Sequence, residues 1–144
     1  MSPVAADPSD LTKVIDLLGA CDLPYQDLTT SHLALFHVVR QGQALVGVVG
    51  MERFGNSGLL RSLAVAPAYR KQKLGGKLVA ALESSARDSA VRNLYLLTLT
   101  AQEFFAKRGY QITDRLNVPA AMLTSAEFAS LCPASALCMS KRLA

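Results

Sequence analysis

The spacing of apolar residues changes at Pro67, and this change constrains the fold more than any other feature of the chain. The run from Leu59 to Ala66 is apolar enough for a buried strand. After Pro67, apolar residues recur at helical spacing, at Leu74, Leu78, Ala81 and Leu82. We therefore expect a strand that passes through a short loop into a helix.

Similar patterns predict the elements that precede this junction. A capping residue, a proline and an acid in Asp7-Pro8-Ser9-Asp10 favour a first amphipathic helix. Strands are expected over Leu33 to Val39 and Ala44 to Met51, joined by a hairpin turn at Arg40 to Gln43. A second turn at Phe54 to Gly58 leads into the strand that ends before Pro67, so the three strands form an antiparallel meander.

The remaining elements alternate between strand and helix. In order, we expect a strand at Asn93 to Thr98, a helix at Ala101 to Arg108, a strand beginning at Tyr110 to Thr113, a helix at Ser125 to Leu131 and a strand at Ser135 to Arg142. The whole order predicts one α/β (α+β) domain, residues 1–144, with a mixed, mostly antiparallel sheet.

Bulk composition agrees with one soluble domain. The chain has 144 residues, 51% of them hydrophobic, which suits a single core. No apolar run approaches the roughly 20 residues of a membrane span, and the first residues lack a signal-peptide pattern. Three cysteines are an odd number without metal-type spacing, so reduced thiols are expected. These features predict a cytoplasmic protein without a membrane partner.

The loop after Pro67 is strongly basic and precedes two glycines. Arg70, Lys71, Lys73 and Lys77 lie close together around Gly75-Gly76. Amide groups at a helix start lack intrahelical acceptors, and with the helix dipole they attract anions, so a diphosphate is the natural ligand. The alternatives are a solvated basic loop and a nucleic-acid module. A P-loop would need Ser or Thr at Leu78, and no dinucleotide fingerprint is present.

The segment Leu63 to Lys77 resembles the cofactor loop of the GNAT superfamily of acetyltransferases, a hydrophobic strand and proline followed by [QR]-x-x-G-x-[GA]. Arg70 and Gly75 match the first and last motif positions, and Lys73 replaces the middle glycine. A second block, Leu94 to Tyr110, resembles the family's following strand and its A-x-x-F-Y-x-K-x-G-[FY] helix. The resemblance implies a GNAT-like sheet with helices on both faces, and acetyl-CoA as co-substrate.

The same resemblance implies which residues hold the cofactor. Strand backbone would pair with the pantetheine arm, and loop amides would hold the pyrophosphate. The set is Leu63, Ala64, Val65, Arg70, Lys71, Gln72, Lys73, Leu74, Gly75, Gly76, Thr98 and Phe105. Phe105 stands where the family usually has the tyrosine that protonates the departing thiolate. Phenylalanine has no such proton, so Phe105 also fits a plain core aromatic.

Three segments resemble a narrower GNAT subfamily, named for arsenic-resistance operons: Leu45 to Glu52, Leu60 to Pro67 and the tail Glu127 to Ala136. This likeness implies that the acceptor is the amine of a small metabolite or toxin, with a link to arsenic resistance. Capture of arsenic by Cys132 and Cys138 is an alternative, but their spacing favours a structural role. We expect no metal.

Two charged residues are the candidates for catalysis. Glu52 ends a strand and could be the general base, or a solvated glutamate beside Arg53. Arg61 lies in an apolar strand and needs an anionic partner, either a carboxylate of the acceptor or an acid such as Glu52. His32 and His37 receive no catalytic role.

The sequence therefore predicts an acetyl-CoA-dependent N-acetyltransferase that acts on a small amine as a monomer or homodimer. One alternative is a protein of the same fold that binds acyl-CoA without turnover, as a sensor or scaffold. Binding to nucleic acid is not expected, because no aromatic platform accompanies the basic cluster.

Overall fold

The structure, a computed structural model, describes residues 1–143. Its strands form one hydrogen-bonded sheet in the order β1-β2-β3-β4-β5-β7-β6. Residue contacts divide the chain into two compact units. The first contains Met1–Glu52 and Arg61–Ser85, and the second contains Arg53–Leu60 and the chain from Ala86 onward. The mixed, mostly antiparallel sheet with helices confirms the expected fold class; one domain over 1–144 stays a prediction.

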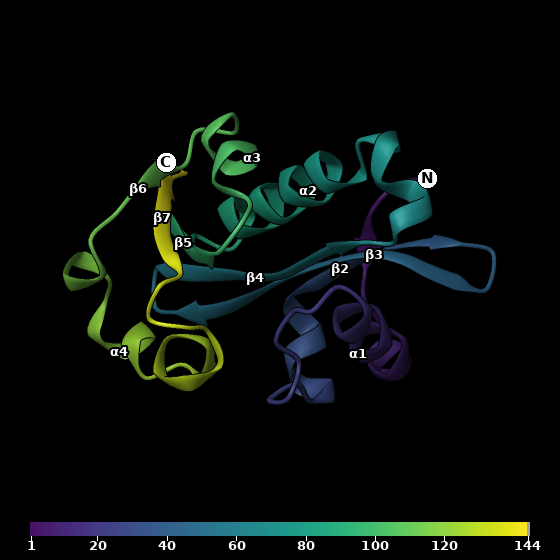
Figure 1. Cartoon of the computed structure of the whole chain (residues 1–144), viewed down its shortest axis with the longest axis horizontal. Helices are drawn as coiled ribbons and strands as arrows, with labels where there is room; N and C mark the ends of the chain where they lie inside the picture. The colour runs from purple at the N-terminus through teal and green to yellow at the C-terminus, as the bar shows by residue number, and fades with distance from the viewer. Residues whose placement is uncertain (144) are drawn as a thin grey trace. The chain divides into compact units, whose positions relative to one another are not determined.

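The first unit is built on an antiparallel sheet with a helix on each face (Figure 1). Its elements are β1 (Val4–Ala5), α1 (Leu11–Ala20), β2 (Phe36–Gln41), most of β3 (Ala44–Phe54), the end of β4 (Ser57–Val65) and most of α2 (Leu74–Asp88). Three 3-10 helices at Pro8–Asp10, Thr30–Leu35 and Pro67–Gln72 join them.

The sequence of the first helix determines where it begins. The Asp7 carboxylate accepts from the amide of Ser9 at 2.9 Å, and the Asp10 carboxylate accepts from the amide of Asp7 at 2.7 Å. This capping box confirms the predicted start. One 3-10 turn precedes α1, and Val14 and Leu18 are then fully buried against the sheet.

The two faces of this sheet are distinguished by alternating residues of β3. Val48 packs in the cluster that α1 covers, together with Phe36 and Leu33. Gly47, the preceding residue, faces Leu78 of α2 instead. Because side chains alternate along a strand, Gly50 and Glu52 lie on the same face as Val48, beneath α1.

The strand expected at Leu33 to Val39 was wrong in its first half. Thr30–Leu35 is a 3-10 helix, and β2 begins at Phe36. Nδ1 of His32 accepts from the amide of Thr29 at 3.1 Å, which caps this turn. The helical turn brings Leu33 into the α1 cluster, where it is fully buried, so local capping and burial replaced the strand pattern.

The second unit is formed around β5, which has the predicted bounds Asn93–Thr98. β5 pairs in parallel with the start of β4, over Ser57–Leu59, and antiparallel with β7 (Leu137–Arg142). The shorter elements are α3 (Gln102–Ala106), β6 (Gln111–Ile112) and α4 (Ala120–Leu123). Its apolar cluster contains Leu59, Val118, Met122, Phe128 and Cys138.

The helix expected at Ser125 to Leu131 is a π-helix over Glu127–Leu131. Oγ of Ser125 accepts from the amide of Phe128 at 3.4 Å, but the N-cap residue of this helix is Ala126 rather than the expected Ser125. Among the described residues, no helix combines the length and apolar character that a membrane span needs.

Candidate active site

The turn between β4 and α2 is the first part of the candidate site. β4 ends at Val65, a 3-10 helix follows, and Lys73 adopts φ 60° and ψ 25° immediately before α2. These angles belong to the left-handed region that glycine favours. The turn therefore keeps the backbone conformation of a glycine, although lysine occupies the position. At the start of α2, the amides of Leu74, Gly75 and Gly76 have no acceptor within the helix.

Arg70 connects this turn to the end of β4 by a hydrogen bond. Its Nε donates to the carbonyl oxygen of Val65 at 3.0 Å, and its Nη2 lies 3.6 Å from the Sγ of Cys21. Lys71, Gln72 and Lys73 are exposed beside it. Positive charge and helix-start amides thus occur together where the sequence predicts the pyrophosphate.

The strand residues before the turn present two faces. Ala64 is 5% exposed and packs in the α1 cluster, whereas Leu63 and Val65 are half-buried and alternate with it. The backbone at Leu63 and Val65 is therefore not enclosed by the α1 core. Pairing of this backbone with a pantetheine arm stays a prediction.

Thr98 and Phe105 belong to the second unit. The Thr98 hydroxyl accepts from the amide of Ala101 at 2.9 Å, just after β5. Phe105 is 4% exposed, and its ring makes edge contacts with Phe104 and Tyr110 at centroid distances of 5.1 and 5.4 Å. These contacts favour the core-aromatic interpretation of Phe105.

The second part of the site is centred on Arg61, whose side chain is 0% exposed. Nη1 donates to Oδ2 of Asp27 and to Oε1 of Glu52, both at 2.6 Å. Nη2 donates to Oδ1 of Asp27 at 2.8 Å, and Nε donates to Oγ of Ser62 at 3.0 Å. Of the two partners expected for Arg61, the structure provides the internal acid Glu52 and adds Asp27.

An irregularity in β4 turns Arg61 toward these acids. Arg61 and Ala64 are three residues apart, a spacing that places side chains on opposite faces of a regular strand. Ser62, between them, has φ 61°, which is a left-handed conformation. Arg61 consequently lies on the α1 face with Ala64 and Glu52, as expected at a β-bulge.

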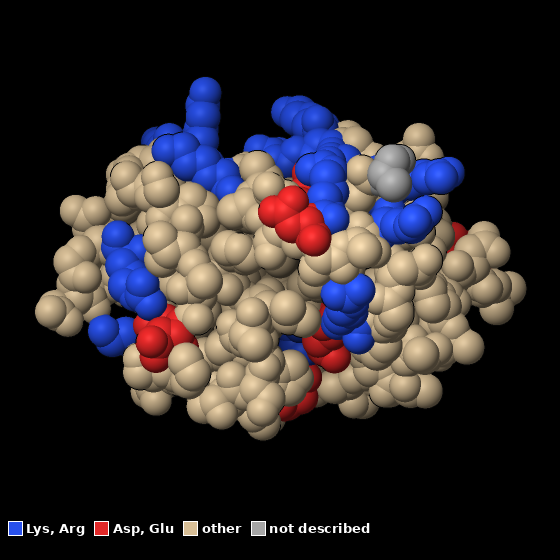
Figure 2. Space-filling model, turned by 180° about the vertical axis from the view of Figure 1, so that it is seen from behind, with Lys and Arg blue, Asp and Glu red and all other residues tan. Residues whose placement is uncertain are grey.

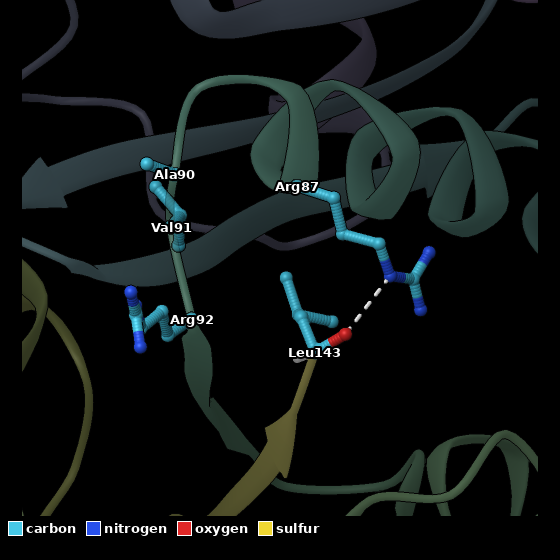
Figure 3. Close-up of a pocket in the computed structure, with 5 residues that line it drawn as sticks. All are labelled: Arg87, Ala90, Val91, Arg92 and Leu143. Atoms are coloured by element: carbon cyan, nitrogen blue, oxygen red, sulfur yellow. Dashed lines mark hydrogen bonds between the residues drawn. The ribbon is translucent and has the colours of Figure 1, made fainter.

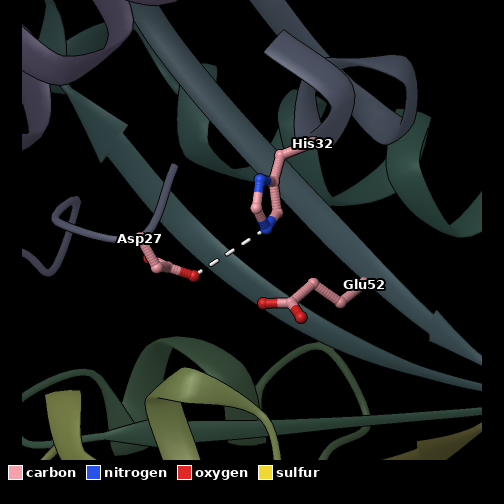
Figure 4. A group of neighbouring side chains, drawn as sticks. All are labelled: Asp27, His32 and Glu52. Atoms are coloured by element: carbon pink, nitrogen blue, oxygen red, sulfur yellow. Dashed lines mark ion pairs between the residues drawn. The ribbon is translucent and has the colours of Figure 1, made fainter. Parts of the chain in front are cut away.

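His32 approaches the same group from the 3-10 helix before β2. Figure 4 shows Asp27, His32 and Glu52 with their side chains turned toward one another. Nε2 of His32 lies 3.8 Å from Oδ2 of Asp27. Because Nδ1 accepts from the Thr29 amide, a neutral His32 ring carries its proton on Nε2, facing Asp27. His37 is separate: its Nδ1 is buried, and burial lowers its pKa.

The electrostatics of the group are dominated by Arg61. Its hydrogen bonds hold the pKa of Asp27 below the usual range, despite partial burial that acts in the opposite direction. Two carboxylates face one guanidinium in this group. Ligand atoms of Asp27, His32 and Glu52 lie within 4.8 Å of one another, near enough for a cation. The buried guanidinium already neutralises part of the carboxylates' charge and disfavours a metal.

Two other surface features contribute less. A hollow of about 360 Å³ in the second unit is lined by Arg87, Ala90, Val91, Arg92 and Leu143. Figure 3 shows the two arginines pointing away from each other, and no predicted site residue lines this hollow. On the face shown in Figure 2, Lys and Arg side chains form several groups, and Asp and Glu side chains lie beside some of them.

Asp27 is the site residue that the sequence analysis missed. It lies in a polar segment before the 3-10 helix, and its contact with Arg61 spans 34 residues. An isolated aspartate among polar residues carries no signal of such a contact. The buried arginine was the available clue, because its several donors need more than one acceptor.

Comparison with known proteins identifies the family. The model of the acetyltransferase (GNAT) domain matches residues 32–112, more than half of the chain. The chain belongs to the GNAT acetyltransferase family. The matched range of this GNAT domain includes both Glu52 and Arg61 and the whole basic turn, and it confirms the superfamily predicted from the sequence. The arsenic-resistance subfamily stays a prediction.

The curated relatives of this GNAT chain are longer proteins. The amino-acid acetyltransferase of Pseudomonas fluorescens (strain Pf0-1) is 25% identical over 114 residues, which cover 78% of this chain and 26% of the relative. The amino-acid acetyltransferase of Ectopseudomonas mendocina (strain ymp) is 30% identical over 88 residues, which cover 60% of this chain and 20% of the relative. These matches span about a quarter or less of the relatives' length.

Solved structures share the fold at low sequence identity. N-acetylglutamate synthase from Neisseria gonorrhoeae, complexed with coenzyme A and N-acetyl-glutamate, has a TM-score of 0.85 and 20% identity, covering 99% of this chain and 35% of that one. Rv2747 from Mycobacterium tuberculosis, in complex with CoA, has a TM-score of 0.83 and 22% identity, covering both chains fully. A Staphylococcus aureus acetyltransferase of the GNAT family has a TM-score of 0.78 and 18% identity, covering 99% of each chain.

Proposed function

We propose that the protein is an N-acetyltransferase that moves the acetyl group of acetyl-CoA to the amine of a small molecule. The observation that carries this proposal is the turn from β4 into α2. There, a left-handed residue, exposed cations and helix-start amides provide what a diphosphate requires. Family membership supports the same conclusion, since the family's model covers the turn.

In this proposal Glu52 is the general base. Acetyl transfer requires a neutral amine, which attacks the thioester carbonyl carbon and expels the CoA thiolate. Glu52 is 19% exposed, so an acceptor ammonium can reach its carboxylate and lose a proton to it. Arg61 holds Glu52 through a hydrogen bond of 2.6 Å and limits its side-chain rotation.

Arg61, which holds Glu52, lies on the same strand as the first residues proposed to bind the cofactor. Arg61 and Ser62 directly precede Leu63, the first residue proposed to pair with the pantetheine arm. A strand rises about 3.3 Å per residue, so Arg61, the hydrogen-bond partner of the base, and the cofactor backbone are separated by only a few residues' length. This proximity supports placing the acceptor amine beside Glu52.

A second candidate is a non-catalytic protein that binds acyl-CoA, as a sensor or scaffold. The observation that favours it is Phe105, a buried aromatic without a hydroxyl at the position of the family's usual acid. Solvent or another group would then have to protonate the thiolate. A thiolate is a stable leaving group near neutral pH, so turnover does not strictly depend on that acid.

The decisive experiment is thiol release from acetyl-CoA over a panel of small amines. We expect release with at least one amine, and a loss of roughly a hundredfold or more in Glu52→Gln. Glu103→Gln, at an exposed site on α3, is the matched control and should keep full activity. Binding of acetyl-CoA without release for any amine would support the sensor instead.

The remaining parts of the proposal concern the location of the protein, its partners and arsenic resistance. We place the protein in the cytoplasm as a monomer or homodimer, without nucleic acid or a metal. A link to arsenic resistance is supported by the sequence likeness of residues 45–142. Cys138 is buried on β7, and burial raises its pKa, so Cys138 is poorly suited to capture arsenite as a thiolate.

A further inference from the structure

The hydrogen bonds of Arg61 determine which acetyl-acceptor molecules the site can bind. Its hydrogen bonds engage Nε, both N–H groups of Nη1 and one of Nη2, and the side chain is 0% exposed. A carboxylate on the acceptor would have to displace Asp27 or Glu52 to reach the guanidinium. Arg61 is therefore not available for recognition of an amino-acid carboxylate.

The surface that an acceptor meets is acidic instead. The side chains of Asp27 and Glu52 are each 19% exposed, and that of His32 is 25% exposed. Figure 4 shows these three side chains turned toward one point. The two carboxylates outnumber the single guanidinium, and their exposed oxygens attract an ammonium group and repel a carboxylate.

We propose that Asp27 is a specificity-determining residue: by occupying Arg61, it directs the site toward cationic amines that lack a carboxylate beside the amine. This inference rests on the proposed acetyltransferase function and names its substrate class. It differs from the amino acids named for the curated relatives, and the difference follows from the occupied arginine.

Matched pairs of amines test this inference on the purified full chain. Each pair consists of an amino acid with a single amine and its decarboxylated amine: phenylalanine with phenethylamine, and leucine with 3-methylbutylamine. Initial rates of thiol release from acetyl-CoA give kcat/KM for each compound. We expect the decarboxylated amine to exceed its amino acid by about tenfold or more in both pairs, mainly through KM.

Variants then connect the preference to Asp27. In Asp27→Asn the side chain loses its charge and one of its two acceptors, so Arg61 can pair with an acceptor carboxylate. The amine-to-acid ratio should fall several-fold, whereas Asp16→Asn, on the exposed face of α1, should leave it unchanged. A purely structural role for Asp27 would lower activity without moving the ratio. If Asp27→Asn does not fold, the wild-type ratios and Asp27→Glu, which retains the charge and should retain the preference, provide the test.

Each outcome is decisive. A wild-type preference for the amino acids, or a ratio that Asp27→Asn does not change, overturns the inference while the acetyltransferase function stands. Absence of thiol release with every compound overturns both the proposed function and this inference.

Discussion

Arg61 donates hydrogen bonds to both carboxylate oxygens of Asp27, at 2.6 Å from Nη1 to Oδ2 and 2.8 Å from Nη2 to Oδ1. Such a two-point contact fixes the plane of the guanidinium as well as its position. The remaining bond of Nη1 is thereby aimed at Glu52. The proposed base is thus held by a residue of the loop that follows α1, through an arginine of β4.

The contact between Arg61 and Asp27 makes stability depend on pH. The folded-state pKa of Asp27 is lowered, mainly by the hydrogen bonds from Arg61. Its contribution to stability is present above the unfolded value near 3.8 and is lost as the pH falls through the folded pKa. Urea midpoints measured from about pH 6 downward should fall less steeply below pH 3.8 in Asp27→Asn than in wild type. Parallel curves for the two proteins would contradict this assignment.

Gly50 allows β3 to pass beneath an aromatic ring. A Cβ at this position would lie 2.1 Å from Cε1 of Phe36, so the ring would have to move. We expect Gly50→Ala to lower the free energy of unfolding by about 1–3 kcal/mol. Gly19→Ala is the control, because its Cβ would make an ordinary contact of 3.5 Å with Tyr25. Equal urea midpoints for Gly50→Ala and wild type would disprove the close packing.

Lys73 adopts a left-handed backbone that costs a lysine about 1 kcal/mol or more. Lys73→Gly should therefore raise the free energy of unfolding by up to roughly 1 kcal/mol. The gain is reduced because glycine also increases the conformational entropy of the unfolded chain. Lys71→Gly removes the same charge from the preceding 3-10 helix, and there glycine should be neutral or destabilising. If Lys73→Gly and Lys71→Gly changed the free energy of unfolding in the same direction, the positive φ of Lys73 would not be the cause of the change.

The proposed absence of a metal has a direct test. Because Arg61 already shares Asp27 and Glu52, dialysis against EDTA should leave thiol-release activity and the melting temperature unchanged. A loss that Zn²⁺ or Mg²⁺ restores would instead assign Asp27, His32 and Glu52 as ligands.

Local patterns were enough to predict much of the fold. The run Asn93 to Thr98 gave the bounds of β5, and the cap at Asp7 gave the start of the first helical segment. Both signals lie within a few consecutive residues. The strand prediction was wrong at Leu33 to Leu35, because a strand or a helical turn can bury the same apolar residues. The capping hydrogen bond of His32 favours the turn.

The candidate site was less predictable, because its contacts are distant in sequence. The basic turn was evident from consecutive residues, and Arg61 was conspicuous as a charge in an apolar strand. Its partner Asp27 lies 34 residues away. The positive φ of Ser62, which turns Arg61 toward Asp27, occurs at a residue type that does not signal it.

Calorimetric titration of acetyl-CoA into the purified chain tests the central claim most directly. We predict saturable binding of one acetyl-CoA per chain, weakened at least tenfold in Gly75→Asp, which places a carboxylate at the start of α2. Asp88→Asn, at the other end of that helix, should bind like wild type. Absence of binding, or equal binding by wild type and Gly75→Asp, would contradict the assignment of this turn as the cofactor site.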